Sequence, residues 1–346
     1  MNRILPRMIH QEELRRARSG PIIRAFLANR SFRVVDYCDF CGCKNISIIS
    51  NLDRYGAPIR AAQCKSCGLI FLVDRLSPDD YAQFYESVYR PLISAYLGRP
   101  VNAQTIQAEQ IRYAENLVPI LRGAGGLVIP RTGGELLDVG GSTGIVASIF
   151  AREFNCAATV LDPSSEELEI AARQGLKTAH GLLESWNPSQ KEQFDLVFCC
   201  QTIDHFFDLR KSLIKLRELT KPQGRVFIDI IDFDVVWQGQ GFIEGAIKID
   251  HCYYLCGENA EHLLRSAGLQ VVFSELASHL DHVSYVCQPS EPVDIPREVS
   301  KRAVTRLQAI QRSRIYLGQA LKIPRNPWDY ARRKLYPLKK ALLGLR

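Results

Sequence analysis

Short apolar runs alternate with amphipathic stretches through the middle of the chain. Residues 135–140 form such a run and end in a glycine turn, and residues 144–154 then show the apolar spacing of a helix. The same order recurs, and further strands are expected at 157–162, 176–181, 194–200 and 225–232. Strands that alternate with helices in this way predict a parallel sheet with helices on both faces.

Two more strands are expected at residues 269–276 and 282–288. The few residues between them cannot form the crossover that a parallel pair needs, which takes about a dozen residues, so these two strands should pair antiparallel. The pattern as a whole predicts a doubly wound α/β fold with a seven-stranded, mostly parallel sheet.

Composition indicates where the protein is located and which roles its cysteines can have. No apolar run reaches the roughly 18 residues of a membrane span, because Arg24 interrupts the run from Ile22 to Leu27, and the first residues lack a secretory apolar region. We therefore expect a cytoplasmic protein. Eleven cysteines in such a chain favour thiols, metal ligands or core residues over a disulfide framework.

The charge is distributed unevenly along the chain. Residues 1–33 carry eight Arg against two Glu, and residues 296–346 carry fourteen Lys or Arg against two acidic residues, although the net charge is only +7. Basic ends on an acidic middle part predict contact with an anionic membrane surface or an acidic partner, and nucleic acid is less favoured. Helical faces exposed to solvent, or docked on the acidic middle part, would give the same pattern.

Residues 301–323 read as a basic amphipathic helix within the second arm. Its apolar positions are Val304, Leu307, Ile310 and Leu317. Such a helix suits the surface of an anionic membrane, and the expected location is therefore cytoplasmic with a peripheral membrane contact.

Two C-x-x-C pairs upstream predict a metal site. Each pair is followed by glycine, and the four thiols belong to Cys38, Cys41, Cys64 and Cys67. Four thiolates on two turns are the ligand set of a closed structural zinc site, which has no open position for catalysis. Cys43 is left as a spare thiol, and chance pairing of cysteines is the alternative.

The glycine turn after residue 139 should face a ligand, since ligands of such sheets bind at the carboxyl ends of the strands. A dinucleotide fingerprint would need glycines where Ser142 and Ile145 stand, so NAD is disfavoured. The order D-V-G-G-S-T-G from Asp138 to Gly144 instead resembles motif I of class I S-adenosylmethionine-dependent methyltransferases, D-x-G-x-G-x-G, with Ser142 as the departure.

The resemblance covers residues 135–288 and implies S-adenosylmethionine as cofactor. Asp162 matches the family's acidic residue for the ribose hydroxyls, and K-P-x-G precedes the fifth strand as in the family. Glu184 stands one step beyond the position of the residue near the adenine. The implied cofactor-binding residues are Asp138, Gly140, Gly141, Ser142, Gly144, Asp162 and Gln201.

A zinc ribbon followed by an aromatic segment with Phe84, Tyr85 and Tyr89 is similar to a subgroup of this family encoded with polysaccharide and sugar-modification genes. The resemblance implies methyl transfer to a hydroxyl of a sugar, a polysaccharide precursor or another small molecule. A catalytically silent scaffold that binds nucleic acid or another polyanion is the alternative. The expected parts are a basic arm (1–33), a zinc-ribbon-like domain (34–90), a helical connector (91–133), the methyltransferase domain (134–288) and a basic tail (289–346).

Two histidines are candidates for the general base that a hydroxyl acceptor requires. Asp204 and His205 follow the fourth strand, where the family often has an acidic residue and a histidine, and His251 follows the fifth. His205 is the favoured base, and Asp204 would orient it or take the proton itself. A second metal at His251, Cys252 and Cys256 has only a generic spacing.

Overall fold

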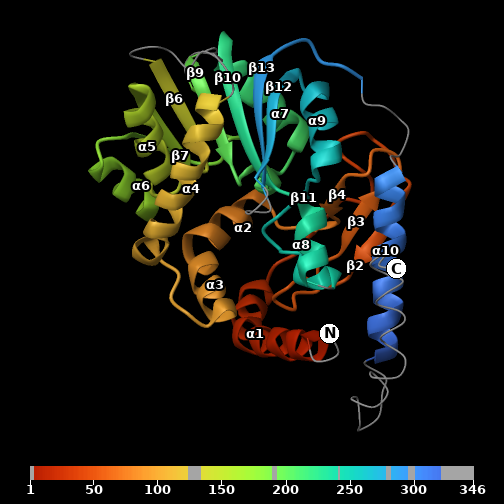
Figure 1. Ribbon diagram of the computed structural model, residues 1–346. Coiled ribbons are helices and arrows are strands. Elements are labelled where there is room, and N and C mark those ends of the chain that lie inside the picture. The colour runs from red at the N-terminus through yellow and green to blue at the C-terminus, as the bar shows by residue number, and fades with distance from the viewer. Residues whose placement is uncertain are drawn as a thin grey trace.

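The computed structural model describes residues 4–123, 134–188, 193–240, 242–277, 282–294 and 301–320. Its central feature is a seven-stranded sheet with the order β12-β13-β10-β9-β6-β7-β8 (Figure 1). The strands are β6 (Gly134–Val139), β7 (Cys156–Asp162), β8 (Lys177–His180), β9 (Phe194–Cys200), β10 (Thr220–Ile231), β12 (Leu269–Ala277) and β13 (His282–Pro289).

Five of these strands run parallel, and β13 pairs antiparallel with both β10 and β12. The predicted doubly wound, mostly parallel sheet and its antiparallel end are therefore confirmed. Successive side chains of a strand point to opposite faces of the sheet, and both faces of β6 are buried. Leu136 and Leu137 accordingly belong to two different buried clusters.

Helices cover both faces of this sheet. On the Leu136 side pack α4 (Ala103–Gly123), α5 (Ile145–Phe154) and α6 (Ser165–Arg173). On the Leu137 side pack α7 (Leu209–Leu219) and α9 (Gly257–Ser266). The α7 helix begins after Asp208, whose side chain accepts a hydrogen bond from the Lys211 N–H as an N-cap.

A second, four-stranded antiparallel sheet has the order β11-β4-β3-β2. It contains β2 (Ile46–Ser50), β3 (Ala61–Cys64), β4 (Ile70–Leu72) and β11 (Tyr253–Tyr254). The last of these strands comes from the segment between β10 and α9, after α8 (Phe233–Gln240) and a 3₁₀ turn at Ile243–Gly245. One buried cluster extends from Phe71 in this sheet to Val197 in β9, so the two sheets share a core.

The segment between the two sheets is helical and aromatic. A short pair, β1 (Arg33–Val34) with β5 (Asp74–Arg75), precedes α2 (Pro78–Gln83), a π-helical turn (Phe84–Val88) and α3 (Tyr89–Leu97). Ser77 caps α2, because its side chain accepts a hydrogen bond from the Asp80 N–H. This segment brings three tyrosines against the large sheet, as described below.

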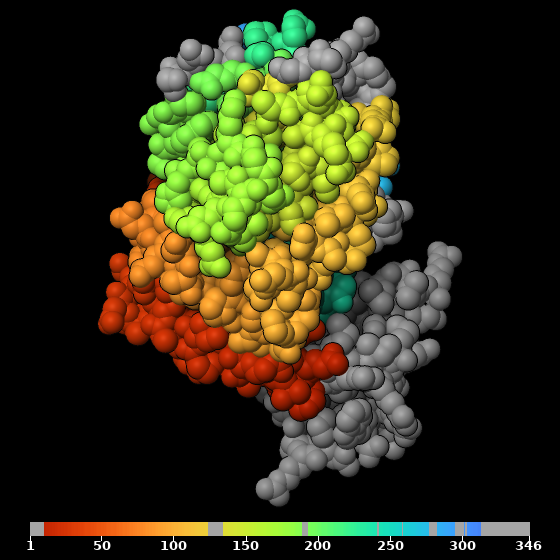
Figure 2. Space-filling view, turned by 90° about the vertical axis from the view of Figure 1, so that its left-hand side faces the viewer, coloured from red at the N-terminus to blue at the C-terminus, as the bar shows by residue number. Residues whose placement is uncertain are grey.

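Both terminal helices dock on the body of the molecule. Helix α1 (Ile4–Leu27) lies against α3, where Tyr96 donates a hydrogen bond to Glu12 at 2.8 Å. Figure 2 shows α1 in red along the lower edge of the molecule, below the orange and green residues of the same face. Helix α10 (Lys301–Ala320) lies beside the small sheet (Figure 1). Gln63 donates a hydrogen bond to the Ala303 carbonyl at 2.9 Å.

The apolar positions expected on the tail helix separate in the structure. Ile310 is fully buried, Leu307 is partly buried against the core, and Val304 is 45% exposed. The side chain of Leu317 lies outside the described residues, as do residues 1–3 of the first arm, 124–133 of the connector, and 295–300 and 321–346 of the tail. Among the described helices, none is long and apolar enough to cross a membrane.

Candidate functional site

A pocket opens at the carboxyl ends of β6, β7 and β9. Its cavity volume is about 260 Å³, close to the lower end of the range of small-molecule sites. Its wall combines the motif I turn with side chains from the N-terminal helices. The lining residues used below are Tyr81, Tyr85, Tyr89, Gly140, Ser142, Asp162, Leu182, Leu183, Glu184, Gln201, Thr202 and His205.

Glycine is required at both ends of the turn after β6. Gly140 and Gly144 have φ of 71° and 75°. A Cβ atom on Gly140 would lie 2.6 Å from Thr202 Cγ2, and one on Gly144 would lie 2.5 Å from Leu176 Cδ1. Both the left-handed backbone and the close approach of neighbours therefore exclude a side chain at these positions.

Ser142 takes the same left-handed conformation as the flanking glycines, with φ of 53°. Its N–H donates to Asp162 Oδ2 at 2.9 Å, which holds the turn, and its buried Oγ has no hydrogen-bond partner among the described residues. The departure from the glycine of motif I thus leaves the backbone path of the turn intact.

Two carboxylates lie under and beside this turn. Asp138 is 2% exposed, and burial, with Asp162 nearby, raises its pKa to about 7. Burial also raises the pKa of Asp162 to about 6, although the N–H groups of Ser164 and Ser142 stabilise its charge. Asp138 Oδ2 has no hydrogen-bond partner among the described residues.

The structure divides the predicted cofactor residues into two groups. Gly140, Ser142, Asp162 and Gln201 line the pocket. Asp138, Gly141 and Gly144 form the layer behind it, since a Cβ on Gly141 would lie 2.7 Å from Asp138 Oδ2. An orphaned carboxylate oxygen, a backbone that approaches closely and an acidic residue at the pocket wall fit an adenosine-type cofactor with an amino group.

In the third-strand region, Glu184 stands one residue beyond the family's position near the adenine and makes contacts within the protein. Leu182 and Leu183 line the pocket, and Glu184 reaches its edge. The Glu184 carboxylate accepts hydrogen bonds from the Phe207 N–H at 2.8 Å and from Ser212 Oγ at 3.1 Å. Glu184 therefore braces the loop that carries His205.

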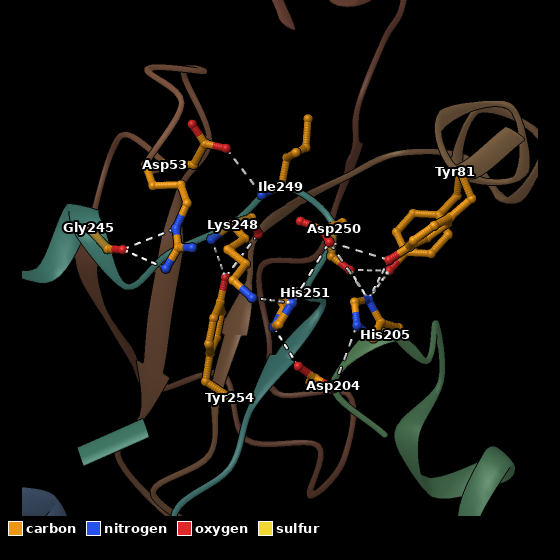
Figure 3. Close-up of polar contacts among 12 residues, drawn as sticks. Asp53, Tyr81, Asp204, His205, Gly245, Lys248, Ile249, Asp250, His251 and Tyr254 are labelled. Atoms are coloured by element: carbon orange, nitrogen blue, oxygen red, sulfur yellow. Dashed lines mark hydrogen bonds and ion pairs between the residues drawn. The ribbon is translucent and has the colours of Figure 1, made fainter. Parts of the chain in front are cut away.

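His205 also lines the pocket, and Figure 3 shows its ring beside Asp250 and Tyr81. Its Nδ1 lies 2.8 Å from the Asp250 carbonyl oxygen, and the Tyr85 hydroxyl is 2.5 Å from the same nitrogen. A carbonyl oxygen only accepts, so this contact favours the tautomer with the hydrogen on Nδ1, from which the Tyr85 hydroxyl would also accept, and with the lone pair of the neutral ring on Nε2. That Nε2 is 3.8 Å from Asp204 Oδ1.

His251 lies behind His205, with the two ring centroids 4.3 Å apart. Its Nδ1 is 2.5 Å from Asp204 Oδ2, and the side chain is largely buried and does not line the described part of the pocket. Burial lowers the pKa of His251 to about 4. Burial alone would raise the pKa of Asp204, but the two histidines outweigh it and lower that pKa well below the ordinary value.

Three tyrosines of the N-terminal segment complete this wall. Tyr81, Tyr85 and Tyr89 line the pocket, and Tyr81 also donates a hydrogen bond to the Asp250 carbonyl. The aromatic segment had marked Tyr85 and Tyr89 in the sequence. Tyr81, Lys248 and Asp250 had no sequence signal except that Lys248 and Asp250 stand close to His251.

The four predicted zinc ligands come together at the edge of the small sheet. Their sulfur atoms all lie within 4.8 Å of one another, and both the Cys38–Cys67 and the Cys41–Cys64 sulfur pairs are 3.6 Å apart. Zinc–sulfur bonds of about 2.3 Å in a tetrahedron require sulfur separations of about 3.8 Å. The cluster fits a tetrahedral metal ion, and Cys43 is not part of it.

Comparison with known proteins gives one match to a family model. Residues 109–273 match a model described as a methyltransferase domain. This range begins within α4 and extends to β12, and it contains the glycine turn, Asp162, Asp204, His205 and His251.

Curated relatives match part of the same region. The ubiquinone biosynthesis O-methyltransferase of Yersinia enterocolitica is 31% identical over 115 residues, which are 30% of this chain and 47% of that protein. The protein of the same name from Klebsiella pneumoniae is 30% identical over 117 residues, which are 31% and 48% of the two chains. The chain thus spans about half the length of these curated relatives.

Solved structures with similar arrangements include a 1,6-didemethyltoxoflavin-N1-methyltransferase from Burkholderia thailandensis. It is 17% identical, covers 68% of this chain and 97% of its own, and gives a TM-score of 0.43. A putative methyltransferase complex with the Trm112 activator from Haloferax volcanii gives the same TM-score at 14% identity, with 54% and 97% coverage.

Proposed function

We propose, from the premise that the chain contains a class I S-adenosylmethionine-dependent methyltransferase domain, that it transfers a methyl group to a hydroxyl of a small-molecule acceptor. The observation that carries this proposal is the pocket that both the motif I turn and His205 line. A cofactor site and a group able to take a proton meet in one cavity, as in-line displacement on a hydroxyl requires.

The turn residues and Asp162 are the proposed cofactor site. When it is bound, S-adenosylmethionine supplies a methyl group already activated on a sulfonium. Asp162 retains unused acceptor capacity on both carboxylate oxygens and would accept hydrogen bonds from the ribose hydroxyls. Gln201 would bind the cofactor from the pocket wall, and Asp138 would support the turn from behind the pocket.

His205 is the proposed general base, acting through Nε2. Its Nδ1–H is directed to the Asp250 carbonyl, so Nε2 is the nitrogen free to receive the acceptor's proton. Asp204 would stabilise the imidazolium that forms, because its Oδ1 lies on that side of the ring. The tyrosines around His205 would exclude water and orient the acceptor.

The acceptor class is proposed in two steps. The curated relatives are named for O-methylation in ubiquinone biosynthesis, which supports a hydroxyl of a small molecule for this chain. A sugar-type hydroxyl is the finer proposal and rests on the resemblance of the ribbon and aromatic segment to the polysaccharide subgroup. We also propose that Cys38, Cys41, Cys64 and Cys67 hold a structural zinc ion.

Methyl transfer from isotope-labelled S-adenosylmethionine tests this function. The full chain is incubated with phenolic and sugar-type hydroxyl acceptors, and labelled product is measured. We expect label in one acceptor class, and His205→Gln should lower turnover by about 100- to 10,000-fold with nearly unchanged cofactor affinity. His262→Gln, on the exposed side of α9, is the matched control and should keep full turnover. Near-normal turnover in His205→Gln would remove the base role from His205.

A further inference from the structure

A lysine lies directly behind the histidine pair. Lys248 Nζ is 2.9 Å from His251 Nε2, on the side of the ring away from Asp204 (Figure 3). The lysine backbone is fixed by Tyr254, whose hydroxyl accepts from the Lys248 N–H at 2.8 Å and donates to the Lys248 carbonyl at 2.9 Å. Lys248 is only partly exposed, so the contact is sheltered from bulk water.

The contact with Lys248 determines which nitrogen of His251 carries the hydrogen. An ammonium group donates and has no acceptor, so His251 Nε2 must accept from Lys248. The hydrogen of the neutral ring is then on Nδ1, which lies 2.5 Å from Asp204 Oδ2 and donates to it. A donor on one side and an acceptor on the other permit a single tautomer.

The fixed tautomer in turn orients Asp204. One oxygen of the carboxylate, Oδ2, is held by His251, and the other, Oδ1, faces His205 Nε2 at 3.8 Å. The chain Lys248–His251–Asp204 therefore directs a negative charge toward the nitrogen that would receive the acceptor's proton.

We propose that Lys248 is a positioning residue for methyl transfer: it fixes His251 as the Nδ1–H tautomer, which holds Asp204 ionised and aimed at His205. The inference rests on the proposed function, because the orientation of Asp204 matters for catalysis only if His205 takes the proton. Neither Lys248 nor its contact with His251 belongs to the motif that suggested the cofactor.

The ionisation states of the groups around His251 agree with this arrangement. Burial lowers the pKa of Lys248 to about 8 and that of His251 to about 4, so the lysine is charged and the histidine neutral near pH 7. Asp250 lies on the same edge of the ring as Lys248, but its Oδ2 is 3.8 Å from Nε2, beyond hydrogen-bond distance, and its pKa stays below the ordinary value despite burial. Other charged or titratable groups near this cluster include His205, Tyr81, Tyr85, Tyr89, Tyr254, Asp53, Arg54, Cys199 and Cys252.

A metal ion is the competing explanation for this cluster. Ligand atoms of Asp204, His205 and His251 lie within 4.8 Å of one another, as a two-histidine, one-carboxylate site would require. A metal on His251 Nδ1 needs the lone pair of that nitrogen, whereas the Lys248 contact places the hydrogen there. The hydrogen-bonded arrangement therefore accounts for the lysine, and the metal site does not.

Nuclear magnetic resonance of ¹⁵N-labelled histidine rings tests the proposal in the full chain. His251→Gln and His205→Gln assign the two ring signals, and S-adenosylhomocysteine is added at saturation. We expect His251 to be neutral and protonated on Nδ1 from pH 6 to pH 8. Lys248→Met, which keeps the length but has no donor, should release the tautomer and raise the His251 titration midpoint by about one pH unit or more.

Two further variants separate positioning from a general effect on folding. Lys248→Gln keeps a neutral donor, so it should retain the Nδ1–H tautomer in part while the midpoint still rises. Lys221→Met removes a lysine that pairs with Asp195 at the far end of β9 and should leave the His251 signals unchanged. Thermal unfolding identifies any variant that does not fold.

The outcomes distinguish this inference from the proposed function. A wild-type His251 protonated on Nε2, or unchanged His251 signals in Lys248→Met, would overturn the role of Lys248 while cofactor binding stands. A second metal equivalent beyond the cysteine site, lost in His251→Gln, would replace the hydrogen-bonded chain with a metal site. A chain that binds no S-adenosylhomocysteine yet shows the fixed tautomer would contradict the proposed function and leave the tautomer assignment in place.

Discussion

Ser142 shows how a single residue can depart from a motif without changing its geometry. A left-handed backbone costs a non-glycine residue about 1–2 kcal/mol. The Ser142 N–H offsets part of this cost through its hydrogen bond to Asp162. Gly140 cannot be replaced in the same way, since a Cβ atom at this position would lie 2.6 Å from Thr202 Cγ2. Gly140→Val would thus displace the wall of the site, which makes it a poorer probe of cofactor binding than a change at Asp162.

Asp138 gives a prediction for stability against pH. Its pKa is about 7 in the folded chain against an ordinary 3.8, so between these values the folded chain binds more protons than the unfolded chain. The free energy of unfolding should therefore fall as pH rises from about 4 to about 7. Asp138→Asn should remove this contribution, which we expect to be a few kcal/mol.

Urea unfolding of both proteins at pH 5 and pH 8 measures this effect. The variant should lose less stability between the two conditions than the wild type, although Asp53 and Asp162 still contribute. Asp79→Asn changes an exposed carboxylate in α2 and is the matched control. Equal losses in wild type and Asp138→Asn would contradict a raised pKa of the buried Asp138 carboxyl.

At the scale of elements, the long strands were predictable and the shortest were not. Apolar runs such as 194–200 are buried on both sides and match β9 without a shift. Strand β11 has two residues, and its pairing with β4 depends on residues far away in the sequence. Local pattern carries no information about such a partner. This pairing places the His251 loop against the Asp204 loop. The sequence therefore indicated both histidines as candidates but could not predict the residues that they contact.

The cysteine cluster gives a prediction for the small sheet. Metal analysis should find one zinc ion per chain, lost in the double variant Cys64→Ser/Cys67→Ser. Thermal unfolding should shift down by on the order of 10 °C, because metal binding here is coupled to folding of the β3–β4 hairpin. Cys43→Ser, outside the cluster, should keep both zinc and stability. Metal-free wild type with an unchanged transition under reducing conditions would refute a structural role.

At the scale of the whole molecule, the two sheets and the terminal helices form one packed body. The small sheet shares its core with the large one, and the tyrosines between them reach the pocket. The small sheet is therefore part of the same packed body as the pocket, an association that the sequence indicated only through resemblance. The distribution of charge in the sequence showed that both ends of the chain are basic. It could not show whether the terminal helices dock on the body, because their burial depends on the surface against which they pack.

Docking of α10 is testable through Arg306. Its guanidinium pairs with Asp234 at 2.5 and 2.8 Å, and its side chain is 3% exposed. Arg306→Met should lower the free energy of unfolding by about 1–3 kcal/mol, below the cost for a fully buried pair because Asp234 is partly exposed. Arg312→Met, on the exposed side of the same helix, should have little effect. Equal stability of the two variants would contradict the docked position of α10.

The membrane hypothesis for the basic arms is tested separately. Ile310 is buried, so the described part of α10 offers fewer apolar residues to a membrane than the sequence pattern suggested. If the tail binds anionic lipid, full-length chain should sediment with anionic vesicles and the variant lacking residues 297–346 should not. Binding that survives this deletion, or no binding at all, would eliminate the tail as a membrane anchor.

The central claim is that the pocket beside the motif I turn binds S-adenosylmethionine, and calorimetric titration with S-adenosylhomocysteine tests it most directly. Wild type should show one site per chain, and Asp162→Ala should weaken binding about tenfold or more, because it removes an acceptor for two ribose hydroxyls. Asp79→Asn should bind as the wild type does. Absence of binding to folded wild type, or equal affinity in wild type and Asp162→Ala, would contradict the account.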